Sequence, residues 1–170
     1  NFRCNKQDRT DFKGVRFGVI GESFWCYGSQ LTTLEGAPRE VGEDFACNDS
    51  QLVSLKGGPQ KVGGDFDCSG NQLTSLKGAP QKVNGYFNCE NNQITSLEGA
   101  PQIVDGNFYC SGNPISEDAI MDIIQTMNDR RITLEEAVSE CWSDLEDEDK
   151  LYLAKHNPDL SPEEKRGYRS

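Results

Sequence analysis

The sequence offers few side chains that could carry out acid–base or nucleophilic chemistry. It holds one histidine, His156, near the end of a predicted helix, where a positive charge is mildly favoured. No Ser-His-Asp or Cys-His arrangement can be identified around it. The acidic run from Asp144 to Asp149 lacks the D-x-D-x-D-G pattern of a calcium loop, and no glycine-rich phosphate loop is present. The sequence therefore predicts no catalytic residue, no metal site and no cofactor.

Seven cysteines are the other reactive side chains, and five of them recur at one spacing. These are Cys26, Cys47, Cys68, Cys89 and Cys110, and each lies 21 residues after the one before. Each also follows a phenylalanine by two residues, and residues two apart in a strand point to the same side. We expect a column of buried, reduced thiols that pack as small apolar side chains, since no C-x-x-C pair is present. Free thiols in this number are typical of a reducing compartment, which favours a cytoplasmic location.

The cysteines belong to a 21-residue unit that recurs with little change. Its clearest copy is CSGNQLTSLKGAPQKVNGYFN, from Cys68 to Asn88. After the cysteine come an asparagine or serine, two leucine or isoleucine positions, a Gly-x-Pro turn and a valine. A period of this length is typical of a solenoid, in which each coil buries its apolar side only against its neighbours. Residues 1–25 match the unit less well, and we expect them to form a degenerate first coil.

The repeat resembles those of leucine-rich-repeat proteins. The pattern F-x-C-x-x-N-x-L matches the later half of their signature, with Phe and Cys at two leucine positions, and the Gly-Ala-Pro form is similar to repeats of uncharacterised bacterial and bacteriophage proteins. The resemblance implies an α/β repeat solenoid with a parallel β ladder over residues 1–115. Ser29 and Ser50 stand where the signature has asparagine, which predicts weaker side-chain-to-backbone hydrogen bonding at the N-terminal end.

The segment L-T-S-L, Leu73 to Leu76, is also similar to the short repeats of secreted bacterial effectors. Effector ligases that share these repeats have a catalytic cysteine in a large separate helical domain, with an aspartate two residues further on. In this chain Cys141 is followed at that place by Ser143, and residues 116–170 are too few for such a domain. Ligase activity is therefore not expected.

Residues 116–170 depart from the repeat and predict helices. Ser116 fits a helix N-cap, and isoleucines and a methionine follow at the spacing of an amphipathic helix. A capping box that begins at Thr133 predicts a second helix, and a third is expected at about 147–156. We expect these helices to form an acidic cap on the last coil.

The formal net charge of −11 is distributed unevenly. Residues 1–115 carry 10 basic and 13 acidic side chains, a net of −3, whereas residues 116–170 carry 7 and 15, a net of −8. Proteins that bind nucleic acid directly normally show a basic stripe. The regularly spaced Lys56, Lys61, Lys77 and Lys82 fit a solvated outer surface instead. With no membrane-spanning run either, we expect neither nucleic acid nor membrane as a direct partner.

Residues that flank Phe and Cys in each strand must point to the opposite, outer side of the sheet. This is the most variable part of the coils, and solenoids use such surfaces for binding. It carries large aromatic side chains, which are favoured interface anchors, together with acidic ones. The predicted partner-binding residues are Trp25, Tyr27, Asp44, Asp65, Asp67, Tyr86, Asn88, Glu90 and Tyr109.

These features predict a non-catalytic module that binds a protein partner through a concave, aromatic and acidic sheet face. Two alternatives stay open. A phage- or bacterium-encoded inhibitor or decoy could engage a basic surface of a host enzyme through the acidic segment, and its affinity would fall steeply with salt. A structural, self-assembling component could stack its open N-terminal coil on another copy.

Overall fold

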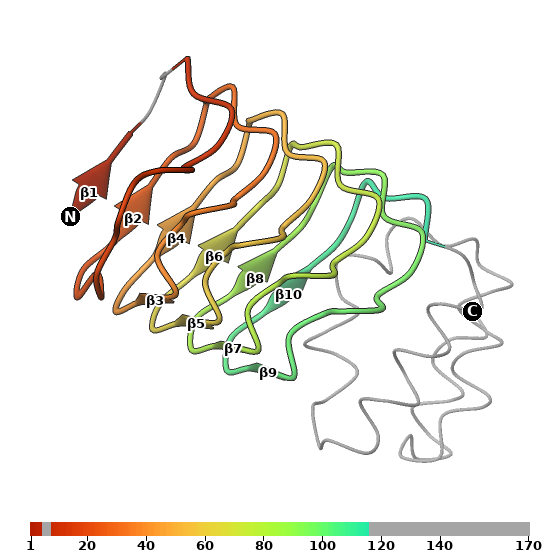
Figure 1. Cartoon of the computed structure of the whole chain (residues 1–170). Helices are drawn as coiled ribbons and strands as arrows, with labels where there is room; N and C mark the ends of the chain where they lie inside the picture. The colour runs from red at the N-terminus through yellow and green to blue at the C-terminus, as the bar shows by residue number, and fades with distance from the viewer. Residues whose placement is uncertain (5–7, 116–170) are drawn as a thin grey trace, which may run out of the picture.

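The computed structural model describes residues 1–4 and 8–115, and in this part the chain winds into a parallel β-solenoid of about five turns (Figure 1). One strand of each coil contributes to a six-stranded sheet, in the order β1-β2-β4-β6-β8-β10. Its strands are β1 (Phe2–Arg3), β2 (Phe24–Trp25), β4 (Phe45–Ala46), β6 (Phe66–Asp67), β8 (Phe87–Asn88) and β10 (Phe108–Tyr109). A second sheet, of four strands, consists of β3 (Glu40–Val41), β5 (Lys61–Val62), β7 (Lys82–Val83) and β9 (Ile103–Val104).

All strand pairs are parallel, and identical repeat positions lie side by side. Phe45 pairs with Phe66 and Val62 pairs with Val83, for example. The predicted parallel ladder is confirmed, because the period of the sequence is also the period of the backbone. The predicted helices of 116–170 lie outside the described residues. Within the part of the chain that is described, no helix crosses a membrane, since none is long and apolar enough.

The predicted α/β class implies helices as well as strands. The described coils contain strands, bends and turns but no helix. The returning side of each coil donates its backbone N–H groups to the preceding coil. Gln60 donates to the carbonyl oxygen of Arg39 (2.8 Å) and Gly63 to that of Val41 (2.9 Å). A helix would need the same groups for bonds four residues back along the chain. The short unit with its Gly-x-Pro turn thus gives a second sheet in place of a helix.

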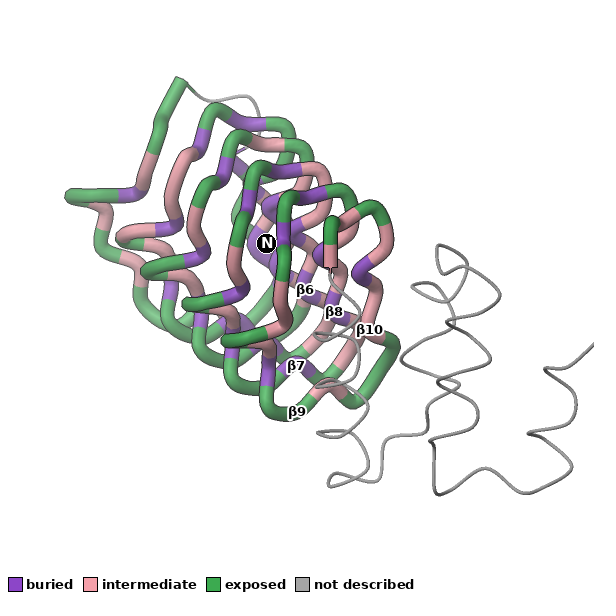
Figure 2. The backbone as a smooth tube through the Cα atoms, turned by 90° about the vertical axis from the view of Figure 1, so that its right-hand side faces the viewer, coloured by how far each residue is buried: buried purple, intermediate pink, exposed green. Residues whose placement is uncertain are grey.

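The interior consists of columns of identical side chains that run along the solenoid. Phe24, Phe45, Phe66 and Phe87 are fully buried, and their rings stack at 5.3, 5.4 and 5.3 Å between centroids, within 7° of parallel. Columns of cysteine, leucine and valine complete the core. Figure 2 shows these buried positions recurring at the same places in successive coils. Each coil therefore covers the apolar surface of the next one.

An asparagine in each of the later coils binds the backbone at a bend. The Nδ2 group of Asn71 donates to the carbonyl oxygens of Cys47 (3.1 Å), Cys68 (3.0 Å) and Ser69 (3.1 Å). Its Oδ1 accepts the N–H of Leu52 in the preceding coil (3.0 Å). The asparagines one and two coils further on make equivalent bonds. One amide thus contacts four backbone groups, and of these only the carbonyl oxygen of Ser69 also accepts a backbone N–H within the described coils, from Asp49 (3.0 Å).

Serine occupies the asparagine position in two earlier coils. The Ser50 hydroxyl accepts the N–H of Ser29 (3.1 Å) and lies 3.0 Å from the Ser29 hydroxyl, but the other contacts of the two serines with the backbone are longer. The Ser50 hydroxyl lies 3.3 Å from the carbonyl oxygen of Asn48 and 3.5 Å from that of Cys26. The N–H of Leu31 lies 3.5 Å from the Ser29 hydroxyl, whereas equivalent N–H groups bind an asparagine at 3.0 Å. The weaker hydrogen bonding predicted for the N-terminal end is therefore present in the structure.

The turn that precedes the four-stranded sheet requires glycine. Gly78 has φ of +97°, and a Cβ atom there would lie 2.8 Å from the carbonyl carbon of Leu55 in the preceding coil. A side chain is disfavoured by both the backbone conformation and the close approach of the next coil. The repeated glycine of the Gly-x-Pro turn is thus a consequence of coil stacking.

Candidate functional site

The outer surface of the six-stranded sheet, which we call the sheet face, is built by alternation along each strand. Each phenylalanine points inward and the residue after it points outward. The outward position is occupied by Arg3, Trp25, Ala46, Asp67, Asn88 and Tyr109 in successive strands, and the residues that flank each Phe-x-Cys unit lie on the same side. All nine predicted binding residues are at these outward positions, and all retain some solvent exposure, unlike the buried Phe and Cys columns.

The aromatic residues of the sheet face form two groups rather than one. Near the N-terminus, the guanidinium of Arg3 lies 4.1 Å above the ring of Trp25, a cation–π contact. In the last two coils the rings of Tyr86 and Tyr109 meet edge to face, with centroids 5.7 Å apart. The Tyr109 hydroxyl also accepts a hydrogen bond from the amide of Asn107 (2.9 Å). Rings that are held by such neighbours are pre-positioned for contact with a partner.

Two of the predicted acidic residues also have a structural role. Asp44 Oδ1 accepts the backbone N–H of Asp65 in the next coil (3.0 Å), and Asp65 Oδ1 accepts that of Tyr86 (2.9 Å). These bonds fix the entry to strands β6 and β8 of the six-stranded sheet. One oxygen of each carboxylate is therefore engaged by the backbone, which the sequence analysis did not foresee.

The other polar side chains of the sheet face are fixed at the exit from each strand. Asp67 accepts both the N–H (3.0 Å) and the hydroxyl (2.6 Å) of Ser69. Asn88 accepts the N–H of Glu90 (3.0 Å), and the Glu90 carboxylate accepts the hydroxyl of Ser111. The sheet face therefore presents carboxylates in defined orientations on a regular backbone.

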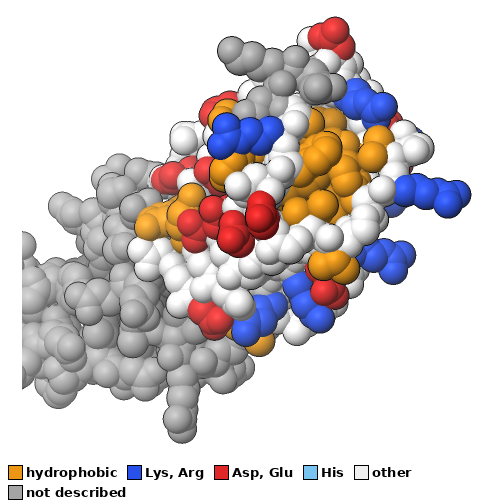
Figure 3. Space-filling model, turned by 90° about the vertical axis from the view of Figure 1, so that its left-hand side faces the viewer, with side chains coloured by type: hydrophobic (Ala, Val, Ile, Leu, Met, Phe, Trp, Pro, Cys, Tyr) orange, Lys and Arg blue, Asp and Glu red, His pale blue; other side chains and the backbone are white. Residues whose placement is uncertain are grey.

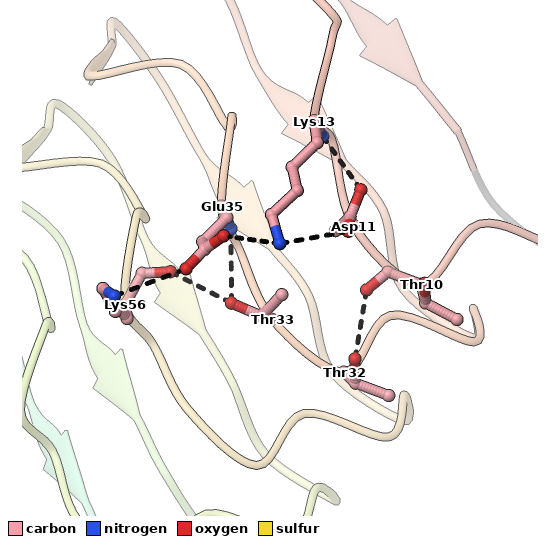
Figure 4. Close-up of polar contacts among 7 residues, drawn as sticks. All are labelled: Thr10, Asp11, Lys13, Thr32, Thr33, Glu35 and Lys56. Atoms are coloured by element: carbon pink, nitrogen blue, oxygen red, sulfur yellow. Dashed lines mark hydrogen bonds and ion pairs between the residues drawn. The ribbon is translucent and has the colours of Figure 1, made fainter.

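Lysines on the other surfaces of the described coils are paired with carboxylates. Lys77 lies 2.9 Å from Glu98, and Lys82 lies 3.5 Å from Asp105. Figure 4 shows a further group, in which Glu35 lies between Lys13 (2.9 Å) and Lys56 (3.4 Å). Lys61 pairs with Glu40 in the same way. These contacts fit the prediction that the regularly spaced lysines form a solvated surface and not a cationic patch.

The carboxylates of the sheet face have no such partner. Asp44, Asp65, Asp67 and Glu90 form no ion pair with any lysine or arginine in the described part of the chain. Their charge acts on Tyr86, whose pKa is raised above its ordinary value by burial and then by Asp67, Asp65 and Asp44. The phenol is thus kept protonated and available as a hydrogen-bond donor.

The inner thiols of the cysteine column are chemically protected, whereas at its N-terminal end the hydrogen bond with Cys26 lowers the pKa of the Cys4 thiol. Cys26, Cys47, Cys68 and Cys89 are free and buried, as predicted, and so is Cys4 in the first coil. Burial raises the pKa of the Cys47 and Cys68 thiols well above the ordinary value, so that the reactive thiolate is disfavoured. The prediction of a reduced thiol is wrong for Cys110, which is disulfide-bonded. Across residues 1–4 and 8–115, no group of three or more His, Cys, Asp or Glu side chains is placed to hold a metal ion.

Comparison with known proteins adds no relative. No protein-family model, no curated protein and no solved structure matches this chain. The sheet face is therefore interpreted from its own geometry. It combines flat aromatic rings, amide groups and oriented carboxylates on a rigid support.

Proposed function

We propose that the chain is a non-catalytic, protein-binding module of leucine-rich-repeat type, which recognises its partner through the sheet face. In this proposal residues 116–170 form a helical cap on the solenoid, and the protein works in the cytoplasm. The partner presents lysine or arginine side chains to Asp67 and Glu90 and apolar surface to the aromatic groups around Trp25 and Tyr109.

One observation carries the proposal. The carboxylates of the sheet face lack a cationic partner within the described residues, whereas five lysines on the other surfaces all have acidic partners. Neighbouring carboxylates repel one another, and an arrangement of this kind is relieved when a positively charged surface binds. Tyrosine and tryptophan beside them supply the large, rigid contact area that interface hot spots commonly use.

The proposal is tested by affinity capture of partners from cell lysate with the full chain, followed by identification by mass spectrometry. The variant Asp67→Asn/Glu90→Gln removes two charges from the sheet face and keeps the shape of both side chains. Its matched control, Glu40→Gln/Glu98→Gln, removes two charges from ion pairs elsewhere. We expect the captured protein to be lost with the first variant and retained with the second.

Two other outcomes would contradict the proposal. Equal capture by the wild type and both variants would move the binding site away from the sheet face. Loss of capture only when Glu146 to Asp149 are neutralised, together with a steep fall at high salt, would favour an inhibitor that acts through the acidic segment.

A further inference from the structure

The two aromatic groups of the sheet face differ in whether a cation lies against their rings. In the first group, the guanidinium of Arg3 lies 4.1 Å from the centre of the Trp25 ring. In the second group, the rings of Tyr86 and Tyr109 contact each other, and no lysine or arginine among the described residues lies over either ring. The same face thus holds one aromatic group with a cation and one without.

The side chains at one repeat position account for this difference. Arg3 reaches Trp25 because the two residues are paired on adjacent strands, β1 and β2, and both point outward. The residue paired with Tyr109 in the same way is Asn88, on strand β8. Its amide oxygen already accepts the N–H of Glu90 (3.0 Å), and a neutral amide brings no positive charge. The tyrosine pair therefore receives no cation from the neighbouring coil.

Carboxylates stand beside the tyrosine pair. Asp65 is directly next to Tyr86, since its Oδ1 accepts the backbone N–H of Tyr86 (2.9 Å). Asp67 lies two residues further along the chain, on strand β6, and projects to the same side of the sheet. After burial, Asp67 and then Asp65 raise the pKa of the Tyr86 phenol, so both carboxylates are within electrostatic reach of its hydroxyl. The ring is therefore flanked by two negative charges.

Each of these two carboxylates keeps one oxygen for a ligand. Oδ1 of Asp65 accepts the N–H of Tyr86, and Oδ1 of Asp67 accepts the N–H and the hydroxyl of Ser69. Their Oδ2 atoms form no hydrogen bond or ion pair within residues 1–4 and 8–115. Residues two apart in a strand have Cα atoms about 6.6 Å apart. The two carboxylates thus offer acceptors that are close enough for one planar donor group to contact both.

We propose that the partner inserts an arginine at this place, with its guanidinium stacked on the Tyr86 ring and hydrogen-bonded to Asp65 and Asp67. This inference rests on the function proposed above and names the side chain that the sheet face recognises. A guanidinium is planar, has five N–H donors and stacks on aromatic rings, whereas the lysine ammonium is compact and strongly hydrated. The contact of Arg3 with Trp25 shows that the sheet face accommodates a guanidinium over an aromatic ring.

The distribution of charge agrees with a cationic group at this face. Figure 3 views the solenoid from the end where β1 lies. Lysine and arginine side chains lie mainly to the right and below in this view, whereas acidic side chains gather beside hydrophobic ones to the left. The lysines have acidic partners, as Lys77 has in Glu98 (2.9 Å), but the carboxylates beside Tyr86 have no cationic partner in the described coils. Charge complementarity therefore favours a basic side chain next to this ring.

Isothermal titration calorimetry of the full chain with two synthetic peptides tests this inference. One peptide alternates arginine with glycine, and the other has lysine in place of each arginine, so that both carry the same charge. We expect the arginine peptide to bind about fivefold more tightly or better. Asp67→Asn should weaken its binding about tenfold, because a charged hydrogen-bond acceptor is lost. The matched control Glu98→Gln removes a carboxylate from an ion pair elsewhere and should leave the affinity unchanged.

Tyr86→Leu separates the effect of stacking from that of charge. The variant keeps both carboxylates and the backbone N–H that Asp65 accepts, and it removes the flat ring. The arginine peptide should then bind no more tightly than the lysine peptide. In the wild type, saturation with the arginine peptide should lower the pKa of Tyr86, because a neighbouring positive charge stabilises the phenolate. NMR of the labelled tyrosine rings measures this change.

Several results would overturn the inference. The arginine peptide could fail to bind, the two peptides could bind the wild type equally, or the preference for arginine could persist in Tyr86→Leu. Circular dichroism establishes that each variant is folded. Should Tyr86→Leu unfold the chain, the titration of the wild type decides, and a Tyr86 pKa that the bound arginine peptide leaves unchanged contradicts the stacked guanidinium.

The same experiments distinguish this inference from the proposed function. A lysate partner that is lost with Asp67→Asn/Glu90→Gln but is retained by Tyr86→Leu, together with equal binding of the two peptides, would overturn the arginine contact and leave recognition through the sheet face standing. A partner that all of these variants capture equally would overturn the proposed function, and the arginine contact with it.

Discussion

The two sides of the six-stranded sheet follow different rules, although they alternate along the same short strands. On the inner side, phenylalanine follows phenylalanine at about 5.3 Å, fully buried from β2 to β8. On the outer side, the adjacent position changes from tryptophan to alanine, aspartate, asparagine and tyrosine. Close packing restricts the inner side, since any change leaves a cavity or a clash with the next coil. The outer side has no such restriction, and variation there is available for recognition.

The largest expected effect is a difference in the free energy of unfolding between variants at two adjacent residues, one on each side of the sheet. Phe66→Ala removes a fully buried ring from the stack and should lower the free energy of unfolding by about 3–5 kcal/mol. Asp67→Ala removes an outward side chain whose hydrogen bonds go only to the neighbouring Ser69, and it should cost about 1 kcal/mol or less. Chemical denaturation measures both. Equal losses would mean that the assignment of inner and outer sides is wrong.

A smaller effect is expected from the asparagine column. Asn71→Ala leaves the buried N–H of Leu52 and the carbonyl oxygen of Cys47 without their side-chain partner, at a cost of about 2–3 kcal/mol. Asn88→Ala, on the outer side of strand β8, is the control and should cost less than about 1 kcal/mol. A negligible effect of Asn71→Ala would show that water replaces the amide.

Ser50→Asn should change stability in the opposite direction. An asparagine there could accept the N–H of Leu31, which now lies 3.5 Å from a serine hydroxyl. One further buried hydrogen bond should raise the free energy of unfolding by about 1 kcal/mol. The same denaturation experiment measures this gain, and a loss of stability would indicate that the first coils are spaced differently from the later ones.

The smallest effect concerns a single phenol on the outer side. Because the pKa of Tyr86 is raised in the folded chain, its contribution to stability is fully present below the ordinary tyrosine pKa and is lost as the pH rises through the folded pKa. Unfolding should therefore become easier above about pH 10, and less so in Tyr86→Phe. Asp67→Asn should lower the Tyr86 pKa towards the ordinary value, as measured by phenolate absorbance. An unchanged pKa would show that the sheet-face charges do not act on this ring.

The sequence predicted the parts of the fold that depend on repetition. Identical residues at a 21-residue spacing have only one arrangement in which each coil covers the next, so the parallel ladder and the inward Phe and Cys followed directly. The second sheet was missed although its valine recurs at the same spacing, because each of its strands has a single inward side chain, such as Val62, and therefore shows no alternation.

The detail of the sheet face could be predicted only in part. Alternation indicated which residues point outward. It could not predict the contact of Arg3 with Trp25, because this pair of side chains is not part of the repeat. The bonds of Asp44 and Asp65 to the next coil had a possible signal, since aspartate precedes the phenylalanine in two successive strands. The disulfide of Cys110 had none, because its position in the repeat is the same as that of the free cysteines.

The most direct test of the central claim compares two double variants in partner capture. Trp25→Ala/Tyr109→Ala truncates one aromatic anchor in each group of the sheet face, and each anchor should contribute about 2 kcal/mol of binding energy. Val53→Ala/Ile103→Ala truncates two exposed apolar residues elsewhere on the solenoid. The account predicts that the first variant loses the captured protein and the second keeps it. Full capture by the Trp25→Ala/Tyr109→Ala variant would contradict recognition through the sheet face.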